Sequence, residues 1–433
     1  MRDAFFPKVM RLVGVALLCA APLLVNNGGW LALAIAAAVG SVYLFRGKRF
    51  RSASPALLGF RLVPLLLALA AMLAAIWQGP GAVQSSLPLL LVAGLLTVAS
   101  AALGHIKVPA ALGFGAFAFA GVASGSWAAW QHIAQGARRA SGYEPLHAIL
   151  YGNLSLSVGL ICLAGLAWAW QCPQRIRWLL LCGLGVLGGL VASVLSGTRG
   201  GWLALPLAGL VFYRIYLNNW PRWWRAVLLV SIALLLVSVY TLAQVGVQGR
   251  VNSAIEEGQD YLQGNAHGSI GIRLELYRVS LQLIAEKPLL GYSLADYQSA
   301  MQALQIEGEI NPRVARYWHV HNDILHAWVR HGLLGLVATL LLYLWPLWFF
   351  SRQLKVATPE QRPVVLAGLL LPVMFFDFGL SYAFFAYPVV LAIYWVWLLV
   401  LASMYLSSGD RVPPLSFGTL GGHRCQGSAS SIV

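Results

Sequence analysis

The feature that most constrains this chain is a succession of apolar runs. Each is long enough to cross the roughly 30 Å hydrocarbon core of a bilayer as a helix, and we count about twelve. Of the 433 residues, 59% are hydrophobic and 10% charged, which is more apolar surface than one soluble domain buries. We therefore predict an all-α polytopic membrane protein. The runs are residues 10–27, 29–46, 62–78, 87–104, 109–133, 151–171, 178–196, 200–217, 226–244, 324–350, 363–384 and 386–406.

The basic residues follow the same alternation. If the N-terminus is cytoplasmic, nineteen of the 29 Lys and Arg residues fall in alternate loops on that side, as the positive-inside rule requires. Both termini are then predicted to be cytoplasmic. The net charge of +15 thus serves orientation in the membrane. It does not predict nucleic-acid binding, since no basic face with interleaved aromatic residues is present. The ten basic residues on the far side are Arg138, Arg139, Arg199, Arg250, Arg273, Arg278, Lys287, Arg313, Arg316 and Arg330.

The runs divide the chain into four parts. Residues 1–244 hold nine predicted helices, 245–323 form the only sizeable polar loop, 324–406 hold the last three helices, and 407–433 are a Gly-, Ser- and Pro-rich tail. The tail is predicted to be disordered in the cytoplasm.

Apolar spacing within the long polar loop indicates helices. They are predicted at 251–262, 270–286 and 294–306, and Ser293 is expected to cap the third. The loop is therefore predicted to be a small helical layer over the membrane.

Four of the nine histidines lie within Trp318–Gly335, where this loop re-enters the membrane. His321 is the candidate general base, because imidazole titrates near neutral pH and can take a proton from a sugar hydroxyl. The alternative is a purely structural histidine. His321, His326 and His331 are spaced by five, which rotates each by about 140° on a helix, so they do not converge on a metal ion. We expect neither a metal nor a cofactor.

Two arginines on the far side are candidates for binding phosphate. Arg199 lies in a Ser-Gly-Thr-Arg-Gly-Gly turn, where glycines let a ligand approach, and a guanidinium matches a pair of phosphate oxygens. Arg273 lies on the predicted helix 270–286 and shares a face with Tyr277, four residues on. The alternatives are an interfacial helix-end arginine for Arg199 and a solvated helix face for Arg273.

Four short motifs stand in a particular order. They are Ser-x-x-Arg at 196–199, Gly-x-Arg-x-x-x-Tyr at 271–277, Lys-Pro-Leu-Leu-Gly at 287–291 and His-Asn-x-x-Leu at 321–325, followed by the last membrane helices. In this combination the chain resembles the O-antigen ligase and polymerase superfamily, most strongly over about 196–335.

The resemblance implies a bacterial inner-membrane glycosyltransferase with a GT-C-like fold and an active site facing the periplasm. Such ligases transfer a glycan from undecaprenyl diphosphate to the lipid A core in lipopolysaccharide biosynthesis, inverting the anomeric centre without a metal. By position, Arg199 and Arg273 would engage the diphosphate, and His321 would activate the acceptor hydroxyl. Further candidates for supporting or acceptor-binding roles are Arg138, Arg139, Tyr277, Arg278, His319 and Asn322.

Several functions share this pattern. An O-antigen polymerase would use the same arginines and histidine but accept a second lipid-linked glycan, and a protein O-oligosaccharyltransferase would accept a peptide. A transporter of lipid-linked glycans is the alternative from another class. It predicts ionisable residues near mid-membrane and repeated halves, whereas here the basic residues without a topological role gather at one surface. The sequence therefore favours an enzyme.

Overall fold

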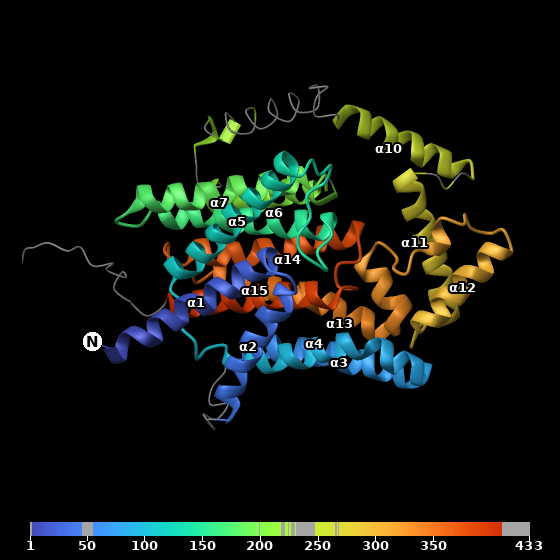
Figure 1. The fold of residues 1–433 in the computed structure, drawn as a ribbon, viewed down its shortest axis with the longest axis horizontal. Coiled ribbons are helices and arrows are strands. Elements are labelled where there is room, and N and C mark those ends of the chain that lie inside the picture. The colour runs from blue at the N-terminus through green and yellow to red at the C-terminus, as the bar shows by residue number, and fades with distance from the viewer. Residues whose placement is uncertain are drawn as a thin grey trace, which may run out of the picture.

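The structure is a computed structural model that describes residues 2–45, 55–198, 200–217, 221–223, 225–226, 230, 247–264, 266 and 268–408. Every regular element within these residues is a helix. Long helices lie side by side in a bundle, and shorter ones gather at one of its ends (Figure 1). The helices of the bundle are α1 (Arg2–Leu24), α2 (Gly28–Phe45), α3 (Pro55–Gln78), α4 (Pro80–Ala99), α5 (Ala110–Ala134), α6 (Ala148–Ala169), α7 (Arg175–Leu195), α8 (Ala204–Phe212), α13 (Asp323–Leu354), α14 (Arg362–Ser381) and α15 (Pro388–Ser407).

Nine helices among the described residues are long and apolar enough to cross a membrane. Each overlaps one of the predicted runs, so the prediction of a polytopic helical protein is confirmed. The apolar part of α1, Met10–Leu24, is shorter than these nine. The predicted run 226–244 lies almost wholly outside the described residues, as does the tail from 409 onward.

The predicted run 200–217 is helical throughout but is not one regular helix. This segment forms a 3-10 turn at Gly200–Leu203, the short helix α8 and a π-helical turn at Tyr213–Leu217. Two glycines open it, and Pro206 follows in the first turn of α8. A proline has no N–H to donate, so it is tolerated in the first turn but prevents the helix from continuing regularly back toward Gly200.

The long polar loop folds into the three predicted helices. They are α10 (Val247–Leu262), α11 (Gly268–Glu286) and α12 (Leu294–Ile306), followed by a 3-10 turn at Val314–Arg316. Ser293 caps α12 by accepting a hydrogen bond from the Asp296 N–H at 3.0 Å, as predicted. Buried side chains of α11 and α12 form a hydrophobic core separate from that of the bundle. This second core includes Val320 and Val329, so it continues to the start of α13.

A break in α13 holds the loop helices against the bundle. Gly332, inside α13, has φ +63°, and a side chain there would meet the Leu289 carbonyl oxygen. Gly291, after α11, has φ +67° and packs against the Val329 carbonyl in the same way. Glycine tolerates this left-handed conformation and leaves room for the backbones to meet. The Tyr292 N–H then donates to the Val329 carbonyl at 2.7 Å.

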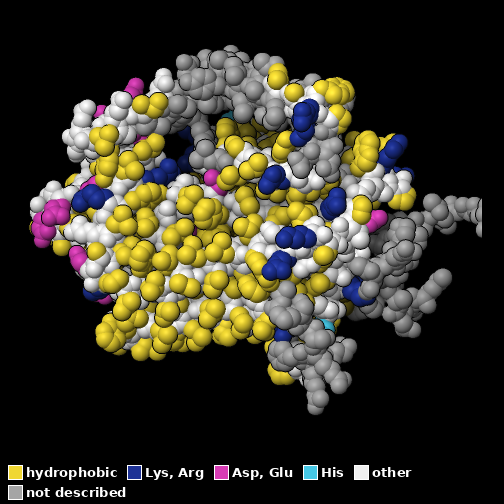
Figure 2. Space-filling model, turned by 180° about the vertical axis from the view of Figure 1, so that it is seen from behind, with side chains coloured by type: hydrophobic (Ala, Val, Ile, Leu, Met, Phe, Trp, Pro, Cys, Tyr) yellow, Lys and Arg dark blue, Asp and Glu magenta, His cyan; other side chains and the backbone are white. Residues whose placement is uncertain are grey.

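Side chains on the surface follow the same division. Figure 2 shows a broad band of hydrophobic side chains over the middle of the molecule, with acidic side chains gathered at the edge where the loop helices lie. Lysines and arginines are more numerous toward the opposite side of this face, and some also lie near the acidic side chains. A belt of apolar surface is what a bilayer-embedded bundle requires, and the unequal distribution of basic residues agrees with the charges of the loops.

Candidate active site

The segment before α13 carries the predicted base. Asn322 is the N-cap of α13, and its side-chain oxygen accepts hydrogen bonds from the Ile324 and Leu325 N–H groups at 2.9 and 3.0 Å. His321 precedes it with φ +57°, a left-handed conformation that is uncommon outside glycine. Such strained residues cluster at functional sites because the surrounding structure must hold them.

Aromatic rings surround the His321 imidazole. Its centroid lies 4.4 Å from that of His319, 4.7 Å from Tyr317 and 5.0 Å from Tyr382. Its Nδ1 is buried and has no hydrogen-bond partner among the described residues. The His321 N–H donates to Nδ1 of His319 at 3.3 Å, so His319 carries its proton on Nε2. The strained loop therefore presents one ring nitrogen free to take up a proton.

Both histidines are held neutral. Burial, followed by the nearby charge of Arg273, lowers the pKa of His321 to about 4, against a smaller opposing effect of the hydrogen bond with His319. Burial also lowers the pKa of His319 to about 3, with further contributions from His321 and His147. A neutral imidazole at physiological pH can accept a proton from a neighbouring hydroxyl.

Helix α11 brings Arg273 and Tyr277 to this loop on one face, as their spacing predicts. The Tyr277 hydroxyl lies 3.1 Å from the His321 carbonyl oxygen and 2.8 Å from that of Leu380, so its single proton is shared between the two acceptors. It thereby ties α11 to the His321 loop and to the end of α14. The Arg273 Nε is buried and has no hydrogen-bond partner among the described residues. Arg273 as a whole is half-buried, and a guanidinium in such a position can bind an anion.

Comparison with known proteins identifies the segment that contains these residues. Residues 184–340 match the family model described as O-antigen ligase. Over this segment the chain is therefore similar to the O-antigen ligase family. It is 27% identical to the O-antigen ligase of Escherichia coli K12 over 156 residues, which cover 36% of this chain and 37% of that protein. It is 24% identical to an uncharacterized protein of Haemophilus influenzae over 245 residues, which cover 56% of this chain and 61% of that one.

The family segment also includes Arg199, which lies outside the described residues. The turn before it is described. Thr198 donates from its hydroxyl to the Ala148 carbonyl at 3.0 Å, and Arg139 donates from Nε to the Ser196 carbonyl at 2.8 Å. Of the two arginines predicted to contact an acceptor, Arg139 therefore holds this turn, and Arg138 is exposed.

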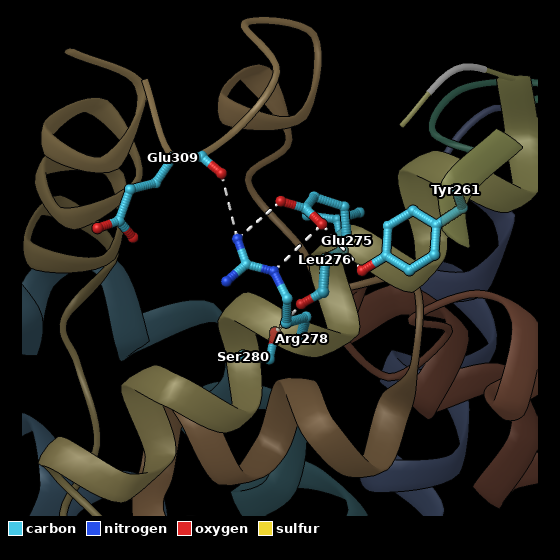
Figure 3. A network of polar contacts seen from close by, with 6 residues as sticks. All are labelled: Tyr261, Glu275, Leu276, Arg278, Ser280 and Glu309. Atoms are coloured by element: carbon cyan, nitrogen blue, oxygen red, sulfur yellow. Dashed lines mark hydrogen bonds and ion pairs between the residues drawn. The ribbon is translucent and has the colours of Figure 1, made fainter. Parts of the chain in front are cut away.

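Arg278 is held in a separate polar network, seen in Figure 3. It forms an ion pair with Glu275 at 2.8 Å and donates to the Glu309 carbonyl at 3.2 Å. Glu275 also accepts from the Tyr261 hydroxyl at 2.9 Å. The Glu275 carboxylate raises the pKa of Arg278. Through Glu275, this network joins α10, α11 and the segment after α12. Its contacts are those of a structural ion pair on the helix surface.

His147 and two tyrosines complete the cluster, and sequence analysis did not single them out. His147 caps α6, where its Nδ1 accepts from the Ile149 N–H at 3.3 Å, and its Nε2 lies 3.1 Å from the Tyr382 hydroxyl. The Tyr382 hydroxyl is in turn 2.9 Å from that of Tyr387. Burial, followed by the charge of Arg139, lowers the pKa of His147. Its neutral ring therefore donates from Nε2 to Tyr382, whose own ring packs against His319 and His321.

No group of three His, Cys, Asp or Glu side chains among the described residues is placed to hold a metal ion. Asp323, the acid nearest to His321 in sequence, accepts from the Tyr343 hydroxyl and the Phe385 N–H, both at 2.7 Å. The Tyr343 bond lies within α13, and the Phe385 bond joins α13 to the segment between α14 and α15. Among the described residues, the basic side chains near His321 are arginines and histidines.

Proposed function

We propose that this chain is a bacterial inner-membrane O-antigen ligase. It transfers a glycan from undecaprenyl diphosphate to the lipid A core, with inversion at the anomeric carbon and its site toward the periplasm. The match of residues 184–340 to the O-antigen ligase family model supports the reaction class, and the distribution of basic residues between the two sets of loops supports the orientation. The observation that carries the proposal is the neutral, strained His321 with Arg273 beside it, both inside the family segment.

The proposed chemistry is one displacement. The neutral His321 ring takes the proton of an acceptor hydroxyl as its oxygen attacks the anomeric carbon. The bond from that carbon to the diphosphate oxygen breaks with its electron pair, and undecaprenyl diphosphate leaves. Arg273, together with Arg199, would hold the negative charge that grows on the leaving group. Charge-assisted hydrogen bonds in a site of low dielectric constant strengthen as that charge develops.

Arg273, after burial, also helps to keep His321 in the neutral form that the reaction needs. Its charge disfavours protonation of the ring before substrate binds, which keeps the base ready. The donor diphosphate would compensate that charge, so the same imidazole would become a better proton acceptor once the donor is in place. Because of this coupling, the position of Arg273 near His321 would link donor binding to the basicity of the imidazole.

The test is reconstitution of the purified chain with a lipid-linked glycan and three separate acceptors. These are rough lipopolysaccharide, a second lipid-linked glycan and a peptide. Product on rough lipopolysaccharide is expected; product on the second glycan would indicate a polymerase, and product on the peptide a protein glycosyltransferase. His321→Gln should reduce turnover by orders of magnitude, whereas the matched variant His132→Gln, at an exposed histidine, should not. Failure to transfer to any acceptor would contradict the enzyme proposal.

A further inference from the structure

A cavity lies behind the histidine cluster and has no role in the reaction described above. Its volume is about 200 Å³, and residues of α3, α4, α12, α13 and the segment before α15 line it. This is more than ten times the ~15 Å³ that holds a single water. Apolar side chains including Leu67, Leu89 and Phe385 form much of the wall. The exposed Ser85 and Pro88 of α4 line it as well, so the cavity reaches the surface of a membrane helix.

Arg330 lines this cavity as a buried cation. It is only 8% exposed and forms no ion pair within 4.0 Å among the described residues. Nη1 donates to the Tyr292 carbonyl at 2.7 Å, and no hydrogen bond to its other nitrogens is found in the described part of the chain. Asp296 acts on Arg330 only from beyond ion-pair distance, and burial of a charge that no counter-ion contacts is costly, particularly at a membrane boundary. An anion in the cavity would supply the missing partner.

His326 offers a second polar group on the same wall. It is 9% exposed, and its Nδ1 has no hydrogen-bond partner among the described residues. It is one turn before Arg330 on α13, so the two face the cavity together. The cavity therefore has a cation and an imidazole on one side and apolar walls on the other. This arrangement fits an amphiphile, with its phosphate group at the polar side and its apolar part against the walls.

Trp318 separates the cavity from the candidate base. It lines the cavity, and its ring lies 6.3 Å from that of His326 and 4.8 Å from that of His319. His319 is in turn 4.4 Å from His321. The side chains of Trp318 and His319 therefore lie between a phosphate bound at Arg330 and the candidate base His321. Arg273, in contrast, is close enough to His321 to lower its pKa.

We propose that this cavity binds a phosphate-bearing part of the acceptor amphiphile. Arg330 and His326 contact the phosphate, and the apolar walls contact the lipid-like portion next to it. The proposal rests on the function proposed above, because it assigns this site to the acceptor and leaves Arg273 to the donor diphosphate. Two phosphate sites on either side of Trp318 would let the enzyme hold both amphiphiles at once. Acceptors that carry phosphate close to the membrane are then preferred.

The test is binding of acceptor to the full-length purified chain without donor, so that it is independent of turnover. The probes are rough lipopolysaccharide, the same material after chemical removal of its phosphates, and phosphatidylglycerol. Arg330→Gln removes the charge but keeps an N–H donor for Tyr292, and Ser85→Phe narrows the cavity from its exposed edge. Gln84→Phe is the matched control, because Gln84 is exposed and does not line the cavity.

The wild-type chain and Gln84→Phe should bind phosphorylated rough lipopolysaccharide about tenfold or more tightly than Arg330→Gln and Ser85→Phe, as expected for loss of a charge-assisted contact. Removal of the phosphates should weaken wild-type binding to the level of Arg330→Gln. Equal binding by all four proteins would overturn the proposal, as would unchanged binding of dephosphorylated material. Tighter binding of phosphatidylglycerol, with the same dependence on Arg330, would assign the cavity to a membrane phospholipid and reject the acceptor. None of these outcomes depends on whether transfer occurs.

Discussion

The pH dependence of transfer is the sharpest test of His321. If its neutral ring is the base, activity is present above its pKa and is lost as the pH falls through that pKa. Burial and Arg273 lower the pKa of His321 to about 4 in the free protein. At about pH 5.5, a histidine with this pKa is about 97% neutral, whereas one with the ordinary value near 6.5 is about 9% neutral. These two cases predict different profiles for kcat/KM.

We therefore expect kcat/KM for the donor to change little between about pH 7.5 and pH 5.5, since it reports the free enzyme. A histidine of ordinary pKa would lose about ninety per cent of kcat/KM over that interval. The pH below which kcat falls should be higher than the pH below which kcat/KM falls. The reason is that the bound diphosphate favours the protonated His321 ring and so raises its pKa in the complex. Transfer of a fluorescent glycan to rough lipopolysaccharide, in detergent at fixed ionic strength, measures both.

Nitrogen-15 resonances of labelled histidines give the same pKa without turnover. The His321 resonance is assigned by its loss in His321→Gln, and His132, which is exposed, serves as the reference. His321→Gln should also reduce turnover by about 10²–10⁴-fold, the usual contribution of a positioned base. A fall in kcat/KM centred near pH 6.5, accompanied by a His321 resonance that titrates there, would refute this account of the site.

Other predictions concern the groups around the base. Arg273→Ala should lower kcat/KM about 10–100-fold, with partial recovery in Arg273→Lys; near-normal transfer would exclude a diphosphate contact. Activity should persist in EDTA, and recovery only on added Mg²⁺ would contradict a reaction served by protein cations. Tyr277→Phe should lower kcat several-fold without changing donor KM, whereas an altered KM alone would place Tyr277 in donor binding. Gly332→Ala should lower the melting temperature, unlike Gly183→Ala, where nothing lies within 4 Å; equal melting would contradict the contact at the break in α13.

Much of the bundle was predictable because a membrane demands long uninterrupted apolar helices. The start of α12 was predictable for a local reason, since the Ser293 side chain caps the chain three residues on. The break in α13 was not. Gly332 stands within a run that is apolar enough to continue, and what requires the break is the Leu289 carbonyl, which arrives from another element. Hydropathy carries no information about such an approach.

The candidate site divides in the same way. Motif order pointed to His321 and Arg273, and spacing placed Tyr277 on the same helix face as Arg273. The partner of His147 could not be found, because it is Tyr382, 235 residues away in sequence, and only folding brings the two together. The extent to which the His321 pKa falls in the free protein could not be predicted either, since it depends on how deeply the ring is buried and on its proximity to Arg273. The burial of a histidine in a loop cannot be predicted from the neighbouring sequence, because distant residues such as Tyr382 cover it.

The way His321 is held explains how a strained residue can remain available for chemistry. Its backbone N–H and carbonyl bond to His319 and Tyr277, and the next residue, Asn322, begins α13 as its N-cap. The hydrogen bonds that fix the loop thus use its backbone, while the ring keeps a free Nδ1 among aromatic neighbours. A left-handed residue costs about 1–3 kcal/mol, and the contacts on either side are what offset it. Because Tyr277 belongs to α11, and its second acceptor, the Leu380 carbonyl, to α14, the base is oriented only when the loop helices are seated on the bundle.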